Sequence, residues 1–214
     1  MEMTQKVGAD FHALISERQS IRSYDPSVSI SEEELKELLR EATLAPSSSN
    51  LQPWRFVVVT DPAVKAELLP IANNQQQVVD AAATVILLGD TEAYKRADRI
   101  YDLSVEAGMP KEARDAYVPR MKEYYRTMSP ETARSVALID GGLVAMQLML
   151  AAKARGYDTV PMGGFSHEKL IEHFQIPAHL IPVMLISIGK AAGQGYPKAR
   201  LPIEEVTSWN KLDQ

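Results

Sequence analysis

The chain has 214 residues, of which 45% are hydrophobic and 24% are charged, so it can fold around a sizeable core. Its formal net charge of −5 argues against a general nucleic-acid-binding protein, so any site for an anion must be local. The lack of cysteine excludes disulfide bonds, thiolate metal sites and cysteine nucleophiles. The N-terminus lacks a secretory-signal pattern and no apolar run reaches about 18 residues, so we predict a cytoplasmic protein with no membrane partner.

Two helices are predicted before the first strand. Apolar residues at helical spacing predict a helix over residues 10–20, with Asp10 as its N-cap. The clearest helix spans residues 29–46, because Ser31 is a favourable N-cap and Glu34 completes a capping box three residues later. A proline ends this second helix.

The middle of the chain contains both strands and helices. Residues 54–60 and 83–90 are predicted strands, and the unbroken apolar run of the second indicates burial on both faces. Residues 91–128 are helical in pattern but polar, which indicates a helical excursion rather than part of the core. A long helix is predicted over residues 129–157, and its apolar portion 141–152 is expected at the centre of the molecule.

The last third of the chain completes the predicted core. It contains a short strand over residues 157–161, a helix over residues 166–174 and a strand over residues 180–190. These elements together predict an α+β fold, with a few central strands wrapped by helices.

The C-terminal arm, at about residues 191–214, is predicted to be irregular because of its glycines and prolines. It nevertheless carries Trp209, which suggests that the arm docks on a surface. We therefore predict a single domain over residues 1–214, with a helical excursion at about 91–128 and this arm at its end.

The common catalytic and metal-binding motifs do not occur. His167, His173 and His179 lie six residues apart, which is not the i, i+4 spacing of a zincin helix, so no metal site is predicted. Gly141-Gly142 lacks the context of a dinucleotide fingerprint, and we interpret the pair as permitting close helix packing. There is neither a P-loop nor a GxSxG elbow.

Four unusual segments remain, at residues 17–24 (ERQSIRSY), 45–56 (APSSSNLQPWRF), 160–165 (VPMGGF) and 195–202 (GYPKARLP). In this order they resemble the nitroreductase family of FMN-dependent NAD(P)H oxidoreductases, over nearly the whole chain. The resemblance implies a mostly antiparallel central sheet wrapped by helices. It also implies a homodimer in which the C-terminal extension is exchanged between subunits.

The first and last of these segments resemble the family's phosphate-binding motifs. Arg18 and Arg22 are spaced i, i+4, so a helix would present both guanidinium groups on one face, and Ser20 adds a hydroxyl. Lys198 and Arg200 alternate with an alanine, so an extended segment would point both cations to one side. Charge-assisted hydrogen bonds contribute roughly 1.5–3 kcal/mol each, which is enough to hold an FMN phosphate without a covalent bond. The resemblance implies that Arg22 lies nearer the pyrimidine edge of the flavin.

Three further segments complete the flavin site that the resemblance implies. One is the serine-rich loop, expected to reach the flavin of the partner subunit, and another includes an asparagine that hydrogen-bonds the ring. The third is the turn expected against the isoalloxazine. The implied residues are Pro46, Ser47, Ser48 and Asn50 of the loop, Asn74 and Gln77 of the second segment, and Pro161, Met162, Gly163 and Gly164 of the turn.

The glycine turn is the part of this implied site with the clearest physical reason. Gly163 and Gly164 carry no Cβ, so their N–H groups can approach the N5 and O4 edge of the flavin. Some family members carry Glu in place of Gly163 and Lys in place of Gln77. The electron acceptor and the flavin reduction potential of this chain are therefore not inferred from those of family members.

The resemblance implies an enzyme in which FMN carries the chemistry, so no side chain acts as a nucleophile. NAD(P)H would deliver hydride to flavin N5, and a quinone, a nitroaromatic or a related small acceptor would then take the electrons, which implies ping-pong kinetics. The apolar segment 139–152 and the arm offer surfaces for the homodimer.

Several alternatives stay open. The chain could be a non-catalytic FMN-binding or storage protein, or a specialised branch such as a reductive dehalogenase or a flavin-fragmenting enzyme. A protein without cofactor is the third alternative. The sequence identifies neither the physiological acceptor nor a preference between NADH and NADPH.

Overall fold

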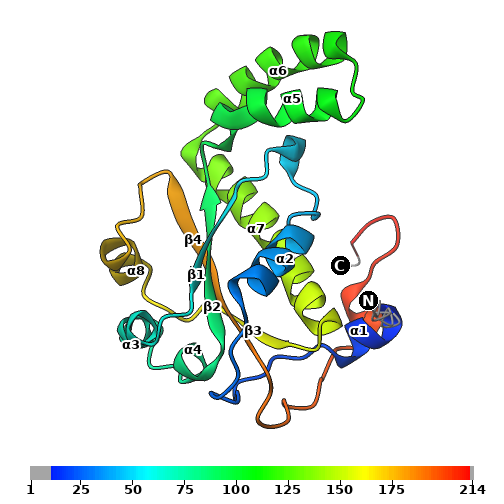
Figure 1. The fold of residues 1–214 in the computed structure, drawn as a ribbon. Helices are drawn as coiled ribbons and strands as arrows, with labels where there is room; N and C mark the ends of the chain where they lie inside the picture. The colour runs from blue at the N-terminus through cyan, green and yellow to red at the C-terminus, as the bar shows by residue number, and fades with distance from the viewer. Residues whose placement is uncertain (1–10, 213–214) are drawn as a thin grey trace, which may run out of the picture.

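The computed structural model describes residues 11–212 of the chain (Figure 1). Its centre is a four-stranded sheet in the order β1-β2-β4-β3, in which every neighbouring pair is antiparallel. This confirms the predicted α+β fold, and the strands lie within one residue of their predicted bounds. The strands are β1 (Trp54–Val59), β2 (Ala83–Asp90), β3 (Asp158–Met162) and β4 (Leu180–Gly189).

Eight α-helices surround this sheet within the described range, together with three short 3-10 helices. The α-helices are α1 (Phe11–Glu17), α2 (Glu32–Ala42), α3 (Pro62–Ile71), α4 (Gln77–Asp80), α5 (Ala97–Glu106), α6 (Lys111–Arg126), α7 (Pro130–Ala154) and α8 (His167–His173). The 3-10 helices are η1 (Ser48–Asn50), η2 (Ala93–Arg96) and η3 (Ile203–Val206).

The sheet separates two hydrophobic cores (Figure 1). β2 is buried along its whole length, as its unbroken apolar run predicts, and successive side chains point to opposite faces. Val85 and Leu87 pack with residues of α2 and α7, whereas Ile86 and Leu88 pack with residues of α3, α4 and α8. The two layers of helices are therefore held by alternate residues of one central strand.

The long helix α7 is the main support of the sheet. It contacts all four strands and α2, so it is a core helix, although among residues 11–212 it is also the one helix long and apolar enough to span a membrane. A Cβ on Gly141 would lie 2.9 Å from Cγ1 of Val183 in β4, whereas a Cβ on Gly142 would meet no atom within 4 Å. The interpretation of the glycine pair as permitting close packing is confirmed for Gly141, whereas Gly142 has no close neighbour within the single chain.

One face of α7 is apolar and exposed in the single chain. Ile139, Leu143 and Met146 recur at helical spacing, and their exposed fractions are 64%, 43% and 38%. We call these three residues the α7 stripe. Soluble monomers rarely expose contiguous apolar surface of this kind, which makes the stripe a candidate contact between subunits.

An arginine after α7 ties this helix to α2. Ser31 Oγ accepts a hydrogen bond from the Glu34 N–H at 3.1 Å, so Ser31 caps α2 as predicted. The Glu34 carboxylate does not complete the capping box but contacts Arg155 at 3.1 Å. Arg155 also donates to both carboxylate oxygens of Glu41, at 3.1 and 2.5 Å. The guanidinium thus bridges two acidic residues of the neighbouring helix.

Arg155→Ala should lower the free energy of unfolding by about 1.5–3 kcal/mol, because hydrogen bonds to charged groups contribute about this much each. Urea unfolding curves measure the change. Arg40→Ala is the matched control, because Arg40 pairs with Glu37 at the exposed surface of α2 and such pairs contribute less than about 1 kcal/mol. Equal losses in the two variants would contradict a special role for Arg155.

In the N-terminal half of the chain one predicted helix boundary is wrong and two helices were missed. The first helix ends at Glu17 rather than continuing to residue 20, and Asp10, its predicted N-cap, lies outside the described residues. The helices α3 and α4 were not predicted. Asp61-Pro62 begins α3, because Asp61 accepts hydrogen bonds from the N–H groups of the first turn of this helix and Pro62 occupies that turn.

The excursion and the arm lie outside the sheet and its two helical layers. α5 and α6 form a helical pair that stands away from the sheet, at the top of Figure 1. The arm is irregular except for η3, and the Trp209 side chain is 83% exposed, so it does not dock on its own chain. The division into one domain, an excursion and an arm stays a prediction.

Candidate functional site

Helix α1 ends at Glu17, so the prediction that Arg18 and Arg22 share one helical face is wrong. Beyond the last helical bond of α1, Ser20 forms a parallel bridge with Thr159 of β3, and the Ile21 N–H donates to the Thr159 carbonyl oxygen at 3.1 Å. Pairing with β3 therefore replaces another helical turn. Alternate residues of an extended segment point to one side, which still brings the two arginines together.

The arm runs back along this segment (Figure 1). Tyr24 forms an antiparallel bridge with Ala191, the Ala192 N–H donates to the Ser23 carbonyl oxygen at 2.9 Å, and the Lys198 ammonium contacts the carbonyl at the end of α1. A pocket of about 150 Å³ lies between the two segments. Its lining residues are Arg18, Gln19, Ser20 and Arg22 from the first segment and Tyr196, Pro197, Lys198 and Arg200 from the arm.

This pocket is strongly cationic. The pKa of Lys198 is lowered by desolvation and then by the positive charges of Arg18, Arg200 and Lys153, while Glu17 acts in the opposite direction. The guanidinium groups of Arg18 and Arg200, the Lys198 ammonium and the Ser20 hydroxyl fit the oxygens of a phosphate dianion, which would relieve this repulsion. Lys153, near the end of α7, was not predicted from the sequence.

The glycine turn after β3 is held by a second segment. The Gly164 carbonyl oxygen accepts hydrogen bonds from Asn73 Nδ2 and Gln75 Nε2, both at 2.9 Å. Gln77 Nε2 donates to Gln75 Oε1 at 3.1 Å and to Met162 Sδ at 3.3 Å. Asn73 and Gln75, which fix the carbonyl of the turn, were not among the predicted site residues.

The predicted residues of this region differ in what they can contact. Met162 and Gln77 are buried, so they support the turn from the protein interior. Pro161 lies within β3. Asn74 is exposed, and among residues 11–212 its side chain has no hydrogen-bond partner. A Cβ on Gly163 would meet no atom within 4 Å, so the backbone borders open space. A planar ring can approach the turn from that side.

The serine-rich loop lies elsewhere in the single chain. Ser48 donates from its backbone N–H to both carboxylate oxygens of Asp140 and from its Oγ to Oδ1, each at 3.1 Å. Burial raises the pKa of the Asp140 carboxyl, and the hydrogen bonds from Ser48 act in the opposite direction. Ser47 Oγ accepts from the Gln52 N–H at 3.0 Å, which fixes the loop further. Pro46, Ser47, Ser48 and Asn50 do not line the cationic pocket.

Comparison with known proteins decides the family. Residues 15–190 match the family described as "Nitroreductase family". The chain belongs to the nitroreductase family. In the part of the chain that the structure describes, no three His, Asp or Glu side chains are grouped as a metal site requires.

Individual relatives agree with this assignment. This nitroreductase is 45% identical over 203 residues, 94% of this chain and 97% of the other, to the Bacillus subtilis (strain 168) protein named "Putative NAD(P)H nitroreductase YdgI". It is 37% identical over 190 residues, 87% of this chain and 88% of the other, to the "CLA biosynthesis enone reductase" of Lactiplantibacillus plantarum. A crystal structure from Exiguobacterium sibiricum 255-15, described as a "putative nitroreductase in complex with FMN", has a TM-score of 0.91 and 46% identity and covers 94% of this chain and 97% of that one.

The family match, the nicotinamide-dependent relatives and the FMN complex together make this nitroreductase an FMN-dependent NAD(P)H oxidoreductase. The predicted family, enzyme class and cofactor are confirmed. A homodimer is typical of the family.

Proposed function

We propose that this nitroreductase transfers electrons from NAD(P)H to quinones or nitroaromatics by a ping-pong mechanism. The observation that carries the proposal is the arrangement along β3. Ser20 of the cationic pocket pairs with Thr159 near the start of this strand, and Gly163 follows its end. At roughly 3.3 Å per residue these points are about 13 Å apart. A phosphate pocket and an open turn at opposite ends of one strand support an elongated FMN lying along it.

The residues of the chain have distinct tasks in this proposal. Arg18, Lys198 and Arg200 would bind the phosphate, and Arg22 would contact the pyrimidine edge of the ring. Gly163 would let the backbone approach the ring, and the hydrogen bonds to the Gly164 carbonyl keep that turn in place. Bound FMN supplies the hydride-transfer chemistry, so no nucleophilic side chain is required.

We also propose that the flavin site is shared between two subunits. In a single chain the loop 46–50 lies apart from the cationic pocket, which supports a role at the flavin of the partner subunit. The α7 stripe and the arm are the exposed apolar surfaces that would form the contact, with the arm exchanged. Cytoplasmic location stays a prediction.

The purified protein should be yellow, and NADH or NADPH should bleach its flavin absorbance under anaerobic conditions. Steady-state rates with a quinone should give parallel double-reciprocal lines, because the oxidised nicotinamide leaves the enzyme before the quinone binds. A yellow protein that neither nicotinamide reduces would be a storage protein and would refute the enzymatic proposal. Intersecting lines would refute the ping-pong mechanism alone.

Activated alkenes are the second candidate class of acceptor, favoured by the 37% identity to an enone reductase. The same kinetic experiment distinguishes the classes when a quinone, a nitroaromatic and an enone are compared at equal concentration. The highest kcat/KM should be found with the quinone or the nitroaromatic. A higher value with the enone would replace the proposed acceptor and leave the enzyme class unchanged.

A further inference from the structure

The helical excursion meets the serine-rich loop at one residue, Ser49. Tyr101 Oη in α5 donates a hydrogen bond to the Ser49 carbonyl oxygen at 3.0 Å. Tyr125 Oη and Tyr117 Oη in α6 donate to Ser49 Oγ, at 3.2 and 3.3 Å. Hydroxyls from two helices of the excursion therefore converge on a single loop residue.

The loop has a backbone conformation that requires support from its surroundings. Ser49, Asn50 and Gln52 have φ angles of +48°, +51° and +47°, in the left-handed region that residues with a Cβ rarely adopt. Such a conformation costs free energy and persists only where neighbouring contacts hold it. Ser49, the first of the three, is the residue that the tyrosines contact.

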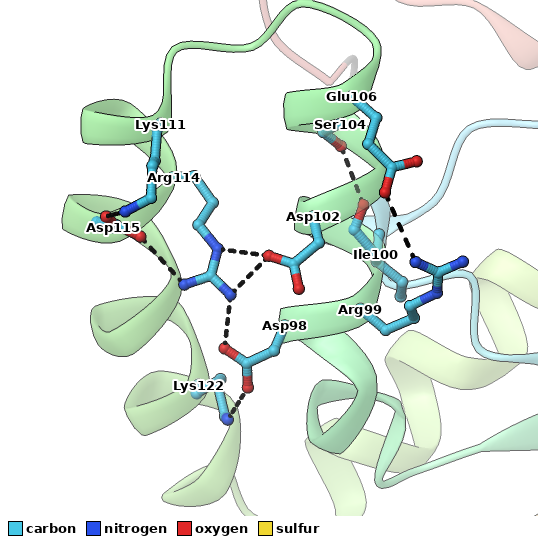
Figure 2. A network of polar contacts seen from close by, with 10 residues as sticks. All are labelled: Asp98, Arg99, Ile100, Asp102, Ser104, Glu106, Lys111, Arg114, Asp115 and Lys122. Atoms are coloured by element: carbon cyan, nitrogen blue, oxygen red, sulfur yellow. Dashed lines mark hydrogen bonds and ion pairs between the residues drawn. The ribbon is translucent and has the colours of Figure 1, made fainter.

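The excursion is rigid enough to provide this support. Figure 2 shows Arg114 of α6 between Asp98 and Asp102 of α5, with distances of 3.0 Å to each carboxylate. Lys122 of α6 contacts Asp98 at 2.5 Å. These ion pairs join one turn of α5 to two turns of α6, and Tyr101 packs with Val118 and Met121 in one hydrophobic cluster. The hydroxyls of Tyr101 and Tyr125 therefore keep a fixed spacing.

The loop is anchored on both sides of Ser49. Before it, Ser48 is hydrogen-bonded to the buried Asp140 of α7. After it, Leu51 is buried in the small hydrophobic core of the excursion. Burial, together with the neighbouring phenols, raises the pKa of Tyr101 to about 12, so its hydroxyl remains a donor at neutral pH.

We propose that Tyr101 and Tyr125 are positioning residues, whose hydroxyls hold Ser49 in its left-handed conformation and thereby present Ser48 and Asn50 to the flavin. This inference rests on the proposed function, because the role of the loop at the flavin is itself proposed. On this inference, the position of the excursion affects the rate at which FMN is released.

Tyr101→Phe and Tyr125→Phe test the inference, because each removes one hydroxyl and keeps the ring. Tyr124→Phe is the matched control, since Tyr124 is the exposed neighbour in α6 and does not contact Ser49. The full-length holoenzyme is used for two measurements: hydrogen exchange of the amides of residues 48–52, and FMN release after dilution. The exchange rate and the FMN release rate should each rise by about 2- to 10-fold in the two test variants, because this is the effect of losing one hydrogen bond. Both rates should stay unchanged in the control.

A glycine at position 49 provides a second test, which separates the effect of the backbone conformation of this residue from the effect of side-chain packing. Ser49→Gly added to Tyr125→Phe should restore slow exchange and slow FMN release, because glycine adopts a positive φ without a steric penalty. Ser49→Ala added to Tyr125→Phe should not restore them. Failure of Ser49→Gly to restore either rate would overturn the inference.

The two measurements also separate this inference from the proposed function. If the amides of residues 48–52 exchange at the wild-type rate in both tyrosine variants, the inference is overturned, whatever the rate of FMN release. Faster exchange with unchanged FMN release would overturn the role of the loop at the flavin. A chain that binds no FMN would refute the proposed function, and amide exchange would still report whether the tyrosines hold the loop.

Discussion

Arg18→Ala should weaken FMN binding by about 10- to 100-fold, because one charge-assisted hydrogen bond to a phosphate contributes roughly 1.5–3 kcal/mol. Arg18 lines the cationic pocket together with Lys198 and Arg200, which come from the other end of the chain. Lys198→Ala and Arg200→Ala should therefore act in the same direction. Titration of the apoprotein with FMN, followed by flavin fluorescence, measures the loss.

Riboflavin is the matched ligand for this experiment, because it carries the same ring and lacks the phosphate. Its affinity should be the same for Arg18→Ala and for the unmodified chain. Lys211→Ala is the matched variant, since Lys211 is an exposed cation of the same arm and does not line the pocket. A parallel loss of riboflavin binding would show that Arg18 supports the fold and does not recognise the phosphate.

Leu143→Glu should convert the proposed dimer to a monomer and release FMN. A carboxylate in the middle of the α7 stripe would lose its hydration without gaining a partner, which costs roughly 3–5 kcal/mol. The dimer dissociation constant should therefore rise by at least about 100-fold. Light scattering at micromolar concentration should give a mass near 23.7 kDa rather than twice that value. Flavin should be lost because the loop of the partner subunit is missing.

Leu103→Glu is the matched control for this change. Leu103 lies in α5 and is 44% exposed, against 43% for Leu143, so the two variants place the same charge at equally exposed leucines. Leu103→Glu should remain dimeric and yellow. A monomeric Leu143→Glu variant that retains FMN would disprove the shared site, and a variant that stays dimeric would show that the α7 stripe is not the contact between subunits.

Elements with a local signal were predicted well. β2 is an unbroken apolar run, and its burial on both faces follows directly from that pattern. α7 begins at Ser129-Pro130 and ends close to Gly156, whose φ of +74° is the left-handed conformation expected after a helix. In these elements the residues that determine the structure are neighbours in sequence.

Features that depend on distant pairing were not predicted. Residues 18–22 carry arginines at helical spacing, but the free carbonyl of Thr159 pairs with the Ile21 N–H and keeps this segment extended. The motifs identified the residues of the cationic pocket, whereas Asn73 and Gln75 were missed. Their role depends on the carbonyl of Gly164, which only the fold brings within reach.

In the site proposed here, FMN bound in the cationic pocket would be a reversible cross-link between an N-terminal and a C-terminal segment of the chain. The walls of the pocket come from residues 18–22 and from residues 196–200, which are joined inside the single chain by few hydrogen bonds. Because Tyr24 already pairs with Ala191, an anion bridging the two walls closes only the short loop between that bridge and the pocket, and closing a short loop costs little entropy. Occupancy by flavin should thus protect residues 196–200 of the arm, which line the pocket, from cleavage by endoproteases.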